Sequence, residues 1–418
     1  MPPESANPAL NQLLLRQIDA HGPVSFKWYM EQVLYHPQHG YYSSGKASLG
    51  RRGDFFTNVS VGRIFGEMMA AQFEEMWLRL GKPMSFSVVE QGANDGQFAN
   101  DVLNWLKTNS PKLFSVVSYW IVEPSNVLQL QQEANLSQWP RNKVRWHTSL
   151  DDFEVGALCG VHFSNELLDS FPVHLVVHDG TQWEEVFVDA TMKGTFRFVQ
   201  GPISNGRLRE QLAKVPVPPE DSTPYRTEVN LKVLSWMEDV SRLLRQGYVL
   251  AVDYGYSRNH YYAPGRLGGT LSVYHQHQRS NDPFEKIGEC DLSAHVDFTS
   301  LAEVAEEHGL RLAGFCDQHH FLMGIGEQRL LEIEDHAVQH SGRLPVEMNE
   351  AIRQFRTLMH PSSMGLAFKY IGFQKGVPAD SEPLRGFKHC GDSRAELGLA
   401  APVEQKKKSD YDSFYDPF

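Results

Sequence analysis

A glycine-containing turn joins the first buried strand of the chain to a helix. The strand is expected over residues 87–90, and the turn reads E-Q-G-A-N-D-G over residues 90–96. Glycines at such a junction let the backbone approach a bound nucleotide closely, at the carboxyl edge of the sheet. Because turns of this kind also arise by chance, the motif alone is a weak signal. The candidate cofactor-binding residues are Glu90, Gly92, Asn94 and Gly96.

An acidic residue closes the second predicted strand. Glu123 ends the segment Y-W-I-V-E, 27 residues after Gly96. A carboxylate at this place can accept hydrogen bonds from both hydroxyls of an adenosine ribose. The structural alternative is a solvated strand end, or a cap for the helix expected from Ser125. The glycine turn after the first strand and Glu123 at the end of the second together predict a cofactor that contains adenosine.

The acid inside the turn separates two classes of cofactor. NAD and S-adenosylmethionine share the adenosine, so Glu123 suits both. A dinucleotide must also place a pyrophosphate against the start of the following helix, and Asp95 would repel it. S-adenosylmethionine instead carries a sulfonium and an ammonium group, which nearby carboxylates favour. The sequence therefore predicts S-adenosylmethionine as cofactor and methyl transfer as the reaction.

Two more acids follow the fourth predicted strand, residues 161–164, at the same edge of the sheet. Methyl transfer needs an acceptor that is aligned with the methyl group and shielded from water. Paired carboxylates can clamp a guanidinium acceptor bidentately, so we predict Glu166 and Asp169 as catalytic residues. Asn165 is predicted to bind the methionine part of the cofactor through its amide. Asp253, after a later strand, is a weaker candidate for the acceptor channel.

Buried strands alternate with helices over most of the chain. This alternation predicts an α/β fold, a doubly wound Rossmann-like sheet with parallel strands and right-handed crossovers. Residues 173–200 instead show alternating apolar runs around a D-G turn, which predicts an inserted antiparallel meander. The strands of the main sheet are expected at 87–90, 119–122, 144–147, 161–164, 248–252, 310–315 and 368–373.

Three regions follow from this pattern. Residues 1–82 are expected to form a helical N-terminal extension with a Gly-Asp-Phe loop and a helix over 61–80. The methyltransferase domain is expected over 83–375, with its insertion at about 173–224 ending in a Pro-rich connector. Residues 376–418 are polar and are expected to form a flexible tail.

Composition narrows the class of protein further. The 418 residues carry 39 Lys and Arg against 51 Asp and Glu, a net charge of −12, which disfavours nucleic-acid binding. The four cysteines form no C-x-x-C pair, and the histidine pairs lack a third ligand at metal spacing, so we expect no bound metal. No apolar run is long enough to cross a bilayer, and the N-terminus resembles neither a signal nor a transit peptide. We therefore expect a cytoplasmic protein without a membrane or nucleic-acid partner, and its oligomeric state is left open.

Seven short motifs occur in the order in which they occur in MidA-like methyltransferases. Together they cover roughly residues 25–373, so the chain resembles this family. The resemblance implies a protein substrate, because the mitochondrial member of the family helps assemble respiratory complex I by methylating an arginine. The acceptor would then be an arginine, in a respiratory-complex subunit. The motifs are G-D-F-F-T (53–57), F-G-E (65–67), E-x-G-x-x-x-G (90–96), S-N-E-L-L-D-S-F-P-V (164–173), V-D-Y-G-Y (252–256), A-H-V-D-F (294–298) and H-P-S-S-M-G (360–365).

The resemblance also adds residues to the cofactor site. It implies that the G-D-F-F-T loop lines the site, with Asp54 near the methionine end of the cofactor. One departure falls in the turn, where the family has glycine in place of Asn94 and a G-T or similar pair in place of Gly96-Gln97. Asparagine tolerates positive φ best among non-glycine residues, so the turn should keep its shape. The added cofactor-binding residues are Gly53, Asp54, Phe55 and Thr57.

Several functions stay open at this point. A protein arginine N-methyltransferase is the leading hypothesis. A catalytically weak assembly factor or binding protein that keeps the fold is the alternative, which the bulkier Asn94 would favour. A small-molecule methyltransferase, with the meander as a lid, is a third hypothesis. A nicotinamide oxidoreductase is the least favoured, because the turn is not suited to a pyrophosphate.

Overall fold

The main sheet of the molecule has the predicted doubly wound architecture. The computed structural model describes residues 7–43, 57–275, 278–340, 343–378 and 382–400. Five neighbouring strands pair in parallel, and β16 runs antiparallel between β10 and β15. In spatial order the strands are β15 (Arg311–Asp317), β16 (Phe368–Lys375), β10 (Leu244–Tyr256), β5 (Leu158–Asn165), β2 (Phe86–Gln91), β3 (Val117–Val122) and β4 (Val144–His147), and the short β14 (Val296–Asp297) pairs with β10.

Helices cover both faces of this sheet because its strands are apolar on both sides. In β2, Val88 packs into one apolar cluster and Val89 into the other, since successive strand residues point to opposite faces. One face is covered by α4 (Ile64–Arg79), α5 (Gln97–Asn109), α12 (Gln318–Gln339) and α13 (Val346–Met359), and the other by α9 (Leu231–Leu243) and α11 (Phe298–Glu307). Shorter helices on the main-sheet side are α6 (Pro111–Val116), α7 (Asn126–Asn135), α10 (Arg258–Tyr261) and α14 (Ser393–Leu397).

The order of the strands creates a switch point between β2 and β5. The chain builds β2, β3 and β4 outward in one direction, then returns to place β5 on the other side of β2. Crossovers therefore leave these two neighbouring strands toward opposite faces, and ligands of open α/β sheets bind outside the carboxyl ends of the strands at such a point. Both predicted site segments, after β2 and after β5, meet there.

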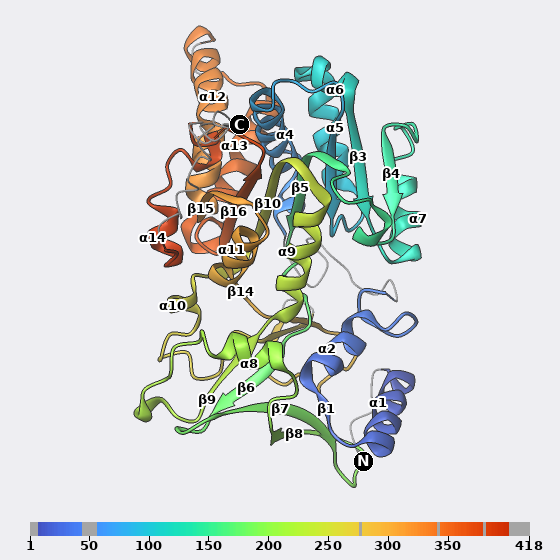
Figure 1. Ribbon diagram of the computed structural model, residues 1–418. Helices are drawn as coiled ribbons and strands as arrows, with labels where there is room; N and C mark the ends of the chain where they lie inside the picture. The colour runs from blue at the N-terminus through green and yellow to red at the C-terminus, as the bar shows by residue number, and fades with distance from the viewer. Residues whose placement is uncertain (1–6, 44–56, 276–277, 341–342, 379–381, 401–418) are drawn as a thin grey trace, which may run out of the picture.

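The inserted meander forms a second antiparallel sheet, which lies below the main sheet in Figure 1. Its first turn is the predicted D-G turn, flanked by the pair His178 and Trp183. Helices α1 (Pro8–His21) and α2 (Phe26–Tyr35) pack against this sheet. Its strands are β6 (His174–His178), β7 (Trp183–Ala190), β8 (Phe196–Gly201), β9 (Tyr225–Val229) and the two-residue β1 (Val24–Ser25).

The insertion contains more regular structure than the sequence predicts. Its connector holds the helix α8 (Gly206–Leu212), and it ends in β9, which pairs with β6. A further small sheet, β12-β11-β13, was not predicted at all. Its strands are β11 (Ser272–His275), β12 (Gln278–Ser280) and β13 (Asp291–Ser293).

One predicted helix starts slightly later than expected, and the prediction for the tail needs correction. The helix predicted over 61–80 is α4, which begins at Ile64 because Gly62, with φ +138, separates it from the short helix α3 (Asn58–Val61). The predicted flexible tail is packed where it is described: Leu384, Phe387 and Leu397 are buried. A Cβ on Gly314 would lie 2.2 Å from Cγ of Phe387, so this ring rests directly on β15. The predicted boundaries at 82 and 375 stay predictions.

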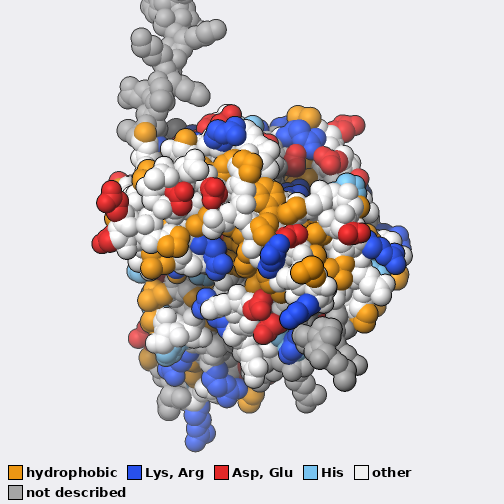
Figure 2. Space-filling model, turned by 90° about the horizontal axis from the view of Figure 1, so that it is seen from below, with side chains coloured by type: hydrophobic (Ala, Val, Ile, Leu, Met, Phe, Trp, Pro, Cys, Tyr) orange, Lys and Arg blue, Asp and Glu red, His pale blue; other side chains and the backbone are white. Residues whose placement is uncertain are grey.

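The surface at the meander end carries both signs of charge. Figure 2 views this end and shows apolar side chains across the middle of the face, with Lys, Arg, Asp and Glu among them. No described helix combines the length and the apolar character that a membrane span requires. The described residues also contain no group of three or more His, Cys, Asp and Glu that could hold a metal ion.

Candidate active site

The turn after β2 has the backbone geometry expected of a cofactor loop. Gly92 and Gly96 have φ of +83 and +82, and Asn94 has φ +46, which confirms that asparagine keeps the turn in the left-handed region. A Cβ on Gly96 would lie 3.1 Å from Cδ1 of Leu136, so the helix α5 begins in close contact with α7. The carboxylate of Asp95 accepts a hydrogen bond from the backbone N–H of Gln97 at 3.0 Å, which holds the start of α5.

Glu123 is tied to this turn by a single glutamine. Nε2 of Gln132 donates to Oε2 of Glu123 at 3.0 Å and to the carbonyl of Asn94 at 2.7 Å. Nε1 of Trp146 donates to Oε1 of Gln132 at 3.0 Å, which fixes the orientation of the amide. The second carboxylate oxygen of Glu123 accepts the backbone N–H of Ser125 at 2.8 Å. Each carboxylate oxygen therefore keeps a lone pair for a ligand, and the arrangement fits the two hydroxyls of a ribose.

The side chain of Glu90, on β2, contacts that of Tyr119 on the neighbouring strand β3. Its Oε2 accepts the hydroxyl proton of Tyr119 at 2.7 Å. Burial raises the pKa of Glu90 to about 8, with Asp95 adding to the rise against the hydrogen bond from Tyr119. Glu90 lies directly below the cofactor turn, and its role as a cofactor ligand stays a prediction.

The segment after β5 holds Glu166 in an unusual backbone conformation. Glu166 has φ +53, a conformation that costs free energy in a residue with a Cβ and persists only when the surroundings hold it in place. Its Oε1 accepts two hydrogen bonds, from Nδ2 of Asn165 at 2.9 Å and from the backbone N–H of Asn58 at 3.3 Å. The second oxygen has no hydrogen-bond donor among the described residues. Glu166 therefore presents one unpaired carboxylate oxygen at the switch point.

Asp253 supports this segment and does not line the acceptor channel. It is fully buried at the end of the main part of β10. Its Oδ2 accepts the backbone N–H groups of residues 167, 168 and 169 at 3.1, 2.7 and 3.4 Å, and its Oδ1 accepts that of Tyr254 at 2.8 Å. The suggestion of a channel residue is thus wrong, and Asp253 positions the segment that carries Glu166 and Asp169.

Replacing Asp253 with alanine should therefore destabilise the fold. Four N–H groups, that of Leu168 buried and the others partly buried, would lose their acceptor, and we expect the free energy of unfolding to fall by about 3 kcal/mol. Urea unfolding of the variant against the unmodified protein measures this change. Asp239→Ala, at a half-exposed position on α9, is the matched control and should change stability by less than about 0.5 kcal/mol. An equal effect of both substitutions would contradict the positioning role of Asp253.

Three carboxylates, those of Asp253, Asp291 and Glu166, lie near Asp169. Burial, followed by the charges of Asp253, Asp291 and Glu166, holds the pKa of Asp169 well above its ordinary value. Burial likewise raises the pKa of Glu166 to about 8 and that of Asp253 to about 7. No Lys, Arg or His among the described residues forms an ion pair with Glu166 or Asp169. The group is thus arranged to receive a cation from outside.

Three tyrosines lie next to this group of acids. The hydroxyl of Tyr42 donates to Oδ1 of Asp291 at 2.7 Å. The ring of Tyr35 stacks on that of Tyr42, and its hydroxyl donates to Oγ of Ser170 at 2.7 Å. Tyr254 lies near both Glu166 and Asp169, whose charges raise its pKa after burial does. Asp291 comes from β13, in the small sheet that was not predicted, so sequence reasoning missed it.

The remaining predicted residues divide into two groups. Thr57 is the N-cap of α3, and its Oγ1 accepts the backbone N–H of Ser60 at 3.2 Å. This cap is a structural role, and a contact of Thr57 with the cofactor stays a prediction. Gly53, Asp54 and Phe55 lie outside the described residues.

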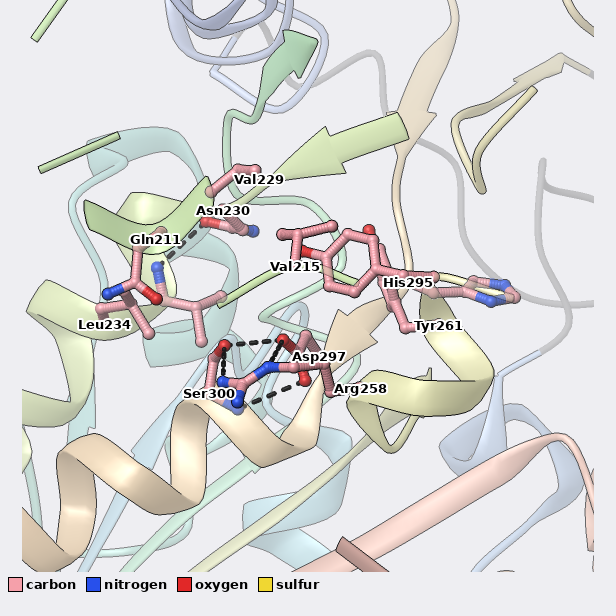
Figure 3. A pocket seen from close by; sticks show the side chains of 12 residues that line it. Gln211, Val215, Val229, Asn230, Leu234, Arg258, Tyr261, His295, Asp297 and Ser300 are labelled. Atoms are coloured by element: carbon pink, nitrogen blue, oxygen red, sulfur yellow. Dashed lines mark hydrogen bonds and ion pairs between the residues drawn. The ribbon is translucent and has the colours of Figure 1, made fainter. Parts of the chain in front are cut away.

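Two other hollows in the molecule lack the chemistry of this site. Figure 3 shows a cavity of about 20 Å³ beside α9 and α11, in which Arg258, Asp297 and Ser300 point toward one another. Arg258 is already paired there, 3.6 Å from Asp297 and 2.7 Å from Glu303. A groove of about 540 Å³ between α4, α12 and α13 is mainly apolar. Neither hollow contains the predicted site residues.

The fold and the switch point together define the class of protein. A doubly wound sheet carries a glycine turn after its first strand, an acid after its second and, after its fourth, two acids that have no ion-pair partner among the described residues. These features are those of a methyltransferase that uses S-adenosylmethionine. The chain matches the family model described as "Putative S-adenosyl-L-methionine-dependent methyltransferase" over residues 68–316, and it belongs to that family.

Similar proteins agree with this class over nearly the whole chain. A Drosophila melanogaster protein named protein arginine methyltransferase NDUFAF7 homolog, mitochondrial, is 31% identical, with 92% of this chain and 90% of that protein covered. The human protein arginine methyltransferase NDUFAF7, mitochondrial, is 28% identical, with 93% and 88% covered. A crystal structure from Burkholderia thailandensis, bound to S-adenosyl-homocysteine, is 30% identical with a TM-score of 0.78, covering 91% of this chain and 95% of that one. The predicted fold, cofactor and reaction class are confirmed.

The predicted cellular location is wrong. The sequence pointed to a cytoplasmic protein because the N-terminus is not rich in arginine. The Drosophila, rat and human relatives, however, are all named mitochondrial proteins. The names of these relatives therefore overturn the prediction of a cytoplasmic location.

Proposed function

We propose that this S-adenosylmethionine-dependent methyltransferase methylates an arginine side chain of a protein. The observation that carries the proposal is the pair Glu166 and Asp169, two acids at the switch point that have no cationic partner among the described residues. A guanidinium is planar, permanently charged and able to donate to two carboxylates at once. The names of the similar Drosophila and human proteins support the same acceptor. A respiratory-complex subunit as the acceptor protein, which the family resemblance implies, is part of the proposal.

The side chains around the switch point have different roles in the proposed reaction: some bind the cofactor and one accepts a proton. Bound S-adenosylmethionine supplies a methyl group activated by its sulfonium. Glu123 and the turn at Asn94 hold the adenosine end, and Asn165 lies beside Glu166 at the reacting end. As the bond from the methyl carbon to nitrogen forms and the bond to sulfur breaks, the guanidinium nitrogen gives up a proton. A carboxylate with a raised pKa, such as Glu166, is well matched to accept it.

Docking of a protein acceptor is supported by the surface around the site. The meander and α2 stand next to the acidic group, since Tyr35 and Tyr42 reach it from the N-terminal region. A protein acceptor is favoured over a small molecule by the names of the similar Drosophila and human proteins, which are both protein arginine methyltransferases.

The raised pKa of Glu166 predicts how the reaction depends on pH. Below about pH 8 the free enzyme holds Glu166 largely protonated, and a protonated carboxyl attracts a guanidinium weakly. Arginine stays charged throughout this range. We therefore expect kcat/KM for an arginine acceptor to rise as the pH increases from 6 to 9. A profile that is flat over this range would contradict the role of Glu166, because an ordinary exposed carboxylate is already ionised at pH 6.

A further inference from the structure

Asn58 joins the cofactor side of the site to the acceptor side. It is the first residue of α3 and is fully buried. Its Nδ2 donates to Oδ1 of Asn165 at 3.0 Å, and its backbone N–H donates to Oε1 of Glu166 at 3.3 Å. Asn58 thus touches the residue predicted to bind the methionine end of the cofactor and the residue predicted to hold the acceptor.

The neighbouring hydrogen bonds determine which atom of the Asn58 side-chain amide has no partner. A backbone N–H only donates, so Oε1 of Glu166 must be an acceptor. Asn165 therefore turns its Nδ2 toward that oxygen, and its own Oδ1 needs a donor, which is Nδ2 of Asn58. The remaining atom of the amide is the Oδ1 of Asn58, a hydrogen-bond acceptor.

This oxygen has no hydrogen-bond partner among the described residues. Oδ1 of Asn58 is buried and unpaired there, although Nδ2 of the same amide bonds Asn165. A buried polar atom without a partner costs free energy, so each one in a native protein calls for an explanation. Since the oxygen can only accept, an N–H or O–H donor from a bound ligand would satisfy it.

We propose that Asn58 is a ligand-binding residue whose Oδ1 accepts a hydrogen bond from a cationic nitrogen bound in the site. Two ligands bring such a nitrogen: the methionine end of S-adenosylmethionine carries an ammonium group, and the acceptor carries a guanidinium. Only the second source rests on the proposed arginine function. In either case Asn58 is the first residue of a chain of hydrogen bonds that continues through Asn165 to the carboxylate of Glu166.

Calorimetric titration separates the two sources. Asn58→Leu removes the oxygen at similar volume. If the ammonium is the donor, the Kd values of S-adenosylmethionine and S-adenosylhomocysteine should rise at least tenfold. The Kd of 5′-methylthioadenosine, which lacks the amino group, should then stay within twofold. If the guanidinium is the donor, both cofactor Kd values should stay within twofold and KM for an arginine peptide should rise at least tenfold.

A second variant separates binding from packing. Asn58→Asp keeps an acceptor oxygen but loses the donor to Asn165, so it should bind the cationic ligand within about threefold of the unmodified protein. The added charge beside Glu166 should also shift the rise of kcat/KM with pH to higher pH. Asn205→Leu, which removes the cap of α8, is the control for stability alone and should leave every Kd unchanged.

The outcomes separate this proposal from the proposed function. If Asn58→Leu folds and changes neither the cofactor Kd nor the acceptor KM by more than twofold, the proposal is wrong. If Asn58→Leu does not fold, Asn58→Ala takes its place with the same criteria. If the unmodified protein binds S-adenosylmethionine but methylates no arginine, the arginine proposal fails, and the result with the cofactor still decides the role of Asn58.

Discussion

Replacing Glu166 with glutamine is expected to lower kcat/KM for an arginine acceptor by about 10²- to 10³-fold, or roughly 3–4 kcal/mol of transition-state stabilisation. Glutamine has the same shape and can keep Oε1, which accepts the bonds from Asn165 and Asn58. Only the unpaired oxygen changes, into an N–H that faces the N–H donors of the guanidinium. The variant therefore removes the proposed contact while leaving the internal network in place. Steady-state kinetics with an arginine peptide measures the loss.

Two controls make this result specific. Glu133→Gln changes an acid on the half-exposed part of α7, which pairs only with Gln129 and Arg141, and it should leave kcat/KM within twofold. The Kd of S-adenosylmethionine should also stay within about threefold in the Glu166 variant. Unchanged methyl transfer by a folded Glu166→Gln protein would show that the carboxylate does not hold the acceptor.

Replacing Glu123 with alanine is expected to weaken S-adenosylmethionine binding by about 10²-fold, or about 2.7 kcal/mol. The carboxylate supplies two charge-assisted hydrogen bonds to the ribose in our account. Its loss also frees Gln132, whose amide holds the carbonyl of Asn94 in the turn. The contact and its support are therefore removed together, which is why the expected effect is large.

Calorimetry with two ligands tests the role of Glu123. Adenosine should lose affinity by a similar factor, because the contact is to the ribose, whereas 2′,3′-dideoxyadenosine should bind both proteins equally weakly. Glu133→Ala, on the same helix as Gln132, should bind S-adenosylmethionine as the unmodified protein does. Equal affinity of the Glu123 variant and the unmodified protein for adenosine would place the ribose elsewhere.

The main sheet could be predicted because each of its strands is marked by a short run of apolar residues in the local sequence. Val88 and Val89 fall on opposite faces of a strand that is apolar on both, and such runs stand out between helices in any parallel sheet. The strand β9 could not be predicted because Arg226 and Glu228 make it look like a polar connector. Glu228 is in fact buried, and it accepts the backbone N–H groups of Thr270 and Leu271. The packed tail was missed for a related reason, since its buried residues are single apolar side chains far apart in a polar sequence.

The residues of the site also divide into those that local sequence signals could predict and those that they could not. The position of Glu123, Asn94 and Glu166 at one edge of the sheet could be predicted because each follows a strand, and the carboxyl ends of parallel strands meet there. Asn58 could not, because its partner Asn165 lies 107 residues away and nothing local marks the contact. Asp291 was missed since its strand is only three residues long, and Asp253 was misread because a buried acid at a strand end looks the same in sequence as one that faces a ligand.

We propose that the acids at the switch point direct a methyl group to an arginine of a protein. The most direct test incubates the enzyme with isotope-labelled S-adenosylmethionine and an extract of its own cells, and identifies the labelled amino acid after hydrolysis of the protein fraction. Our account predicts labelled methylarginine with the unmodified enzyme and little or none with Glu166→Gln. Label in another amino acid or only in small molecules, or methylarginine made equally by the Glu166 variant, would contradict it.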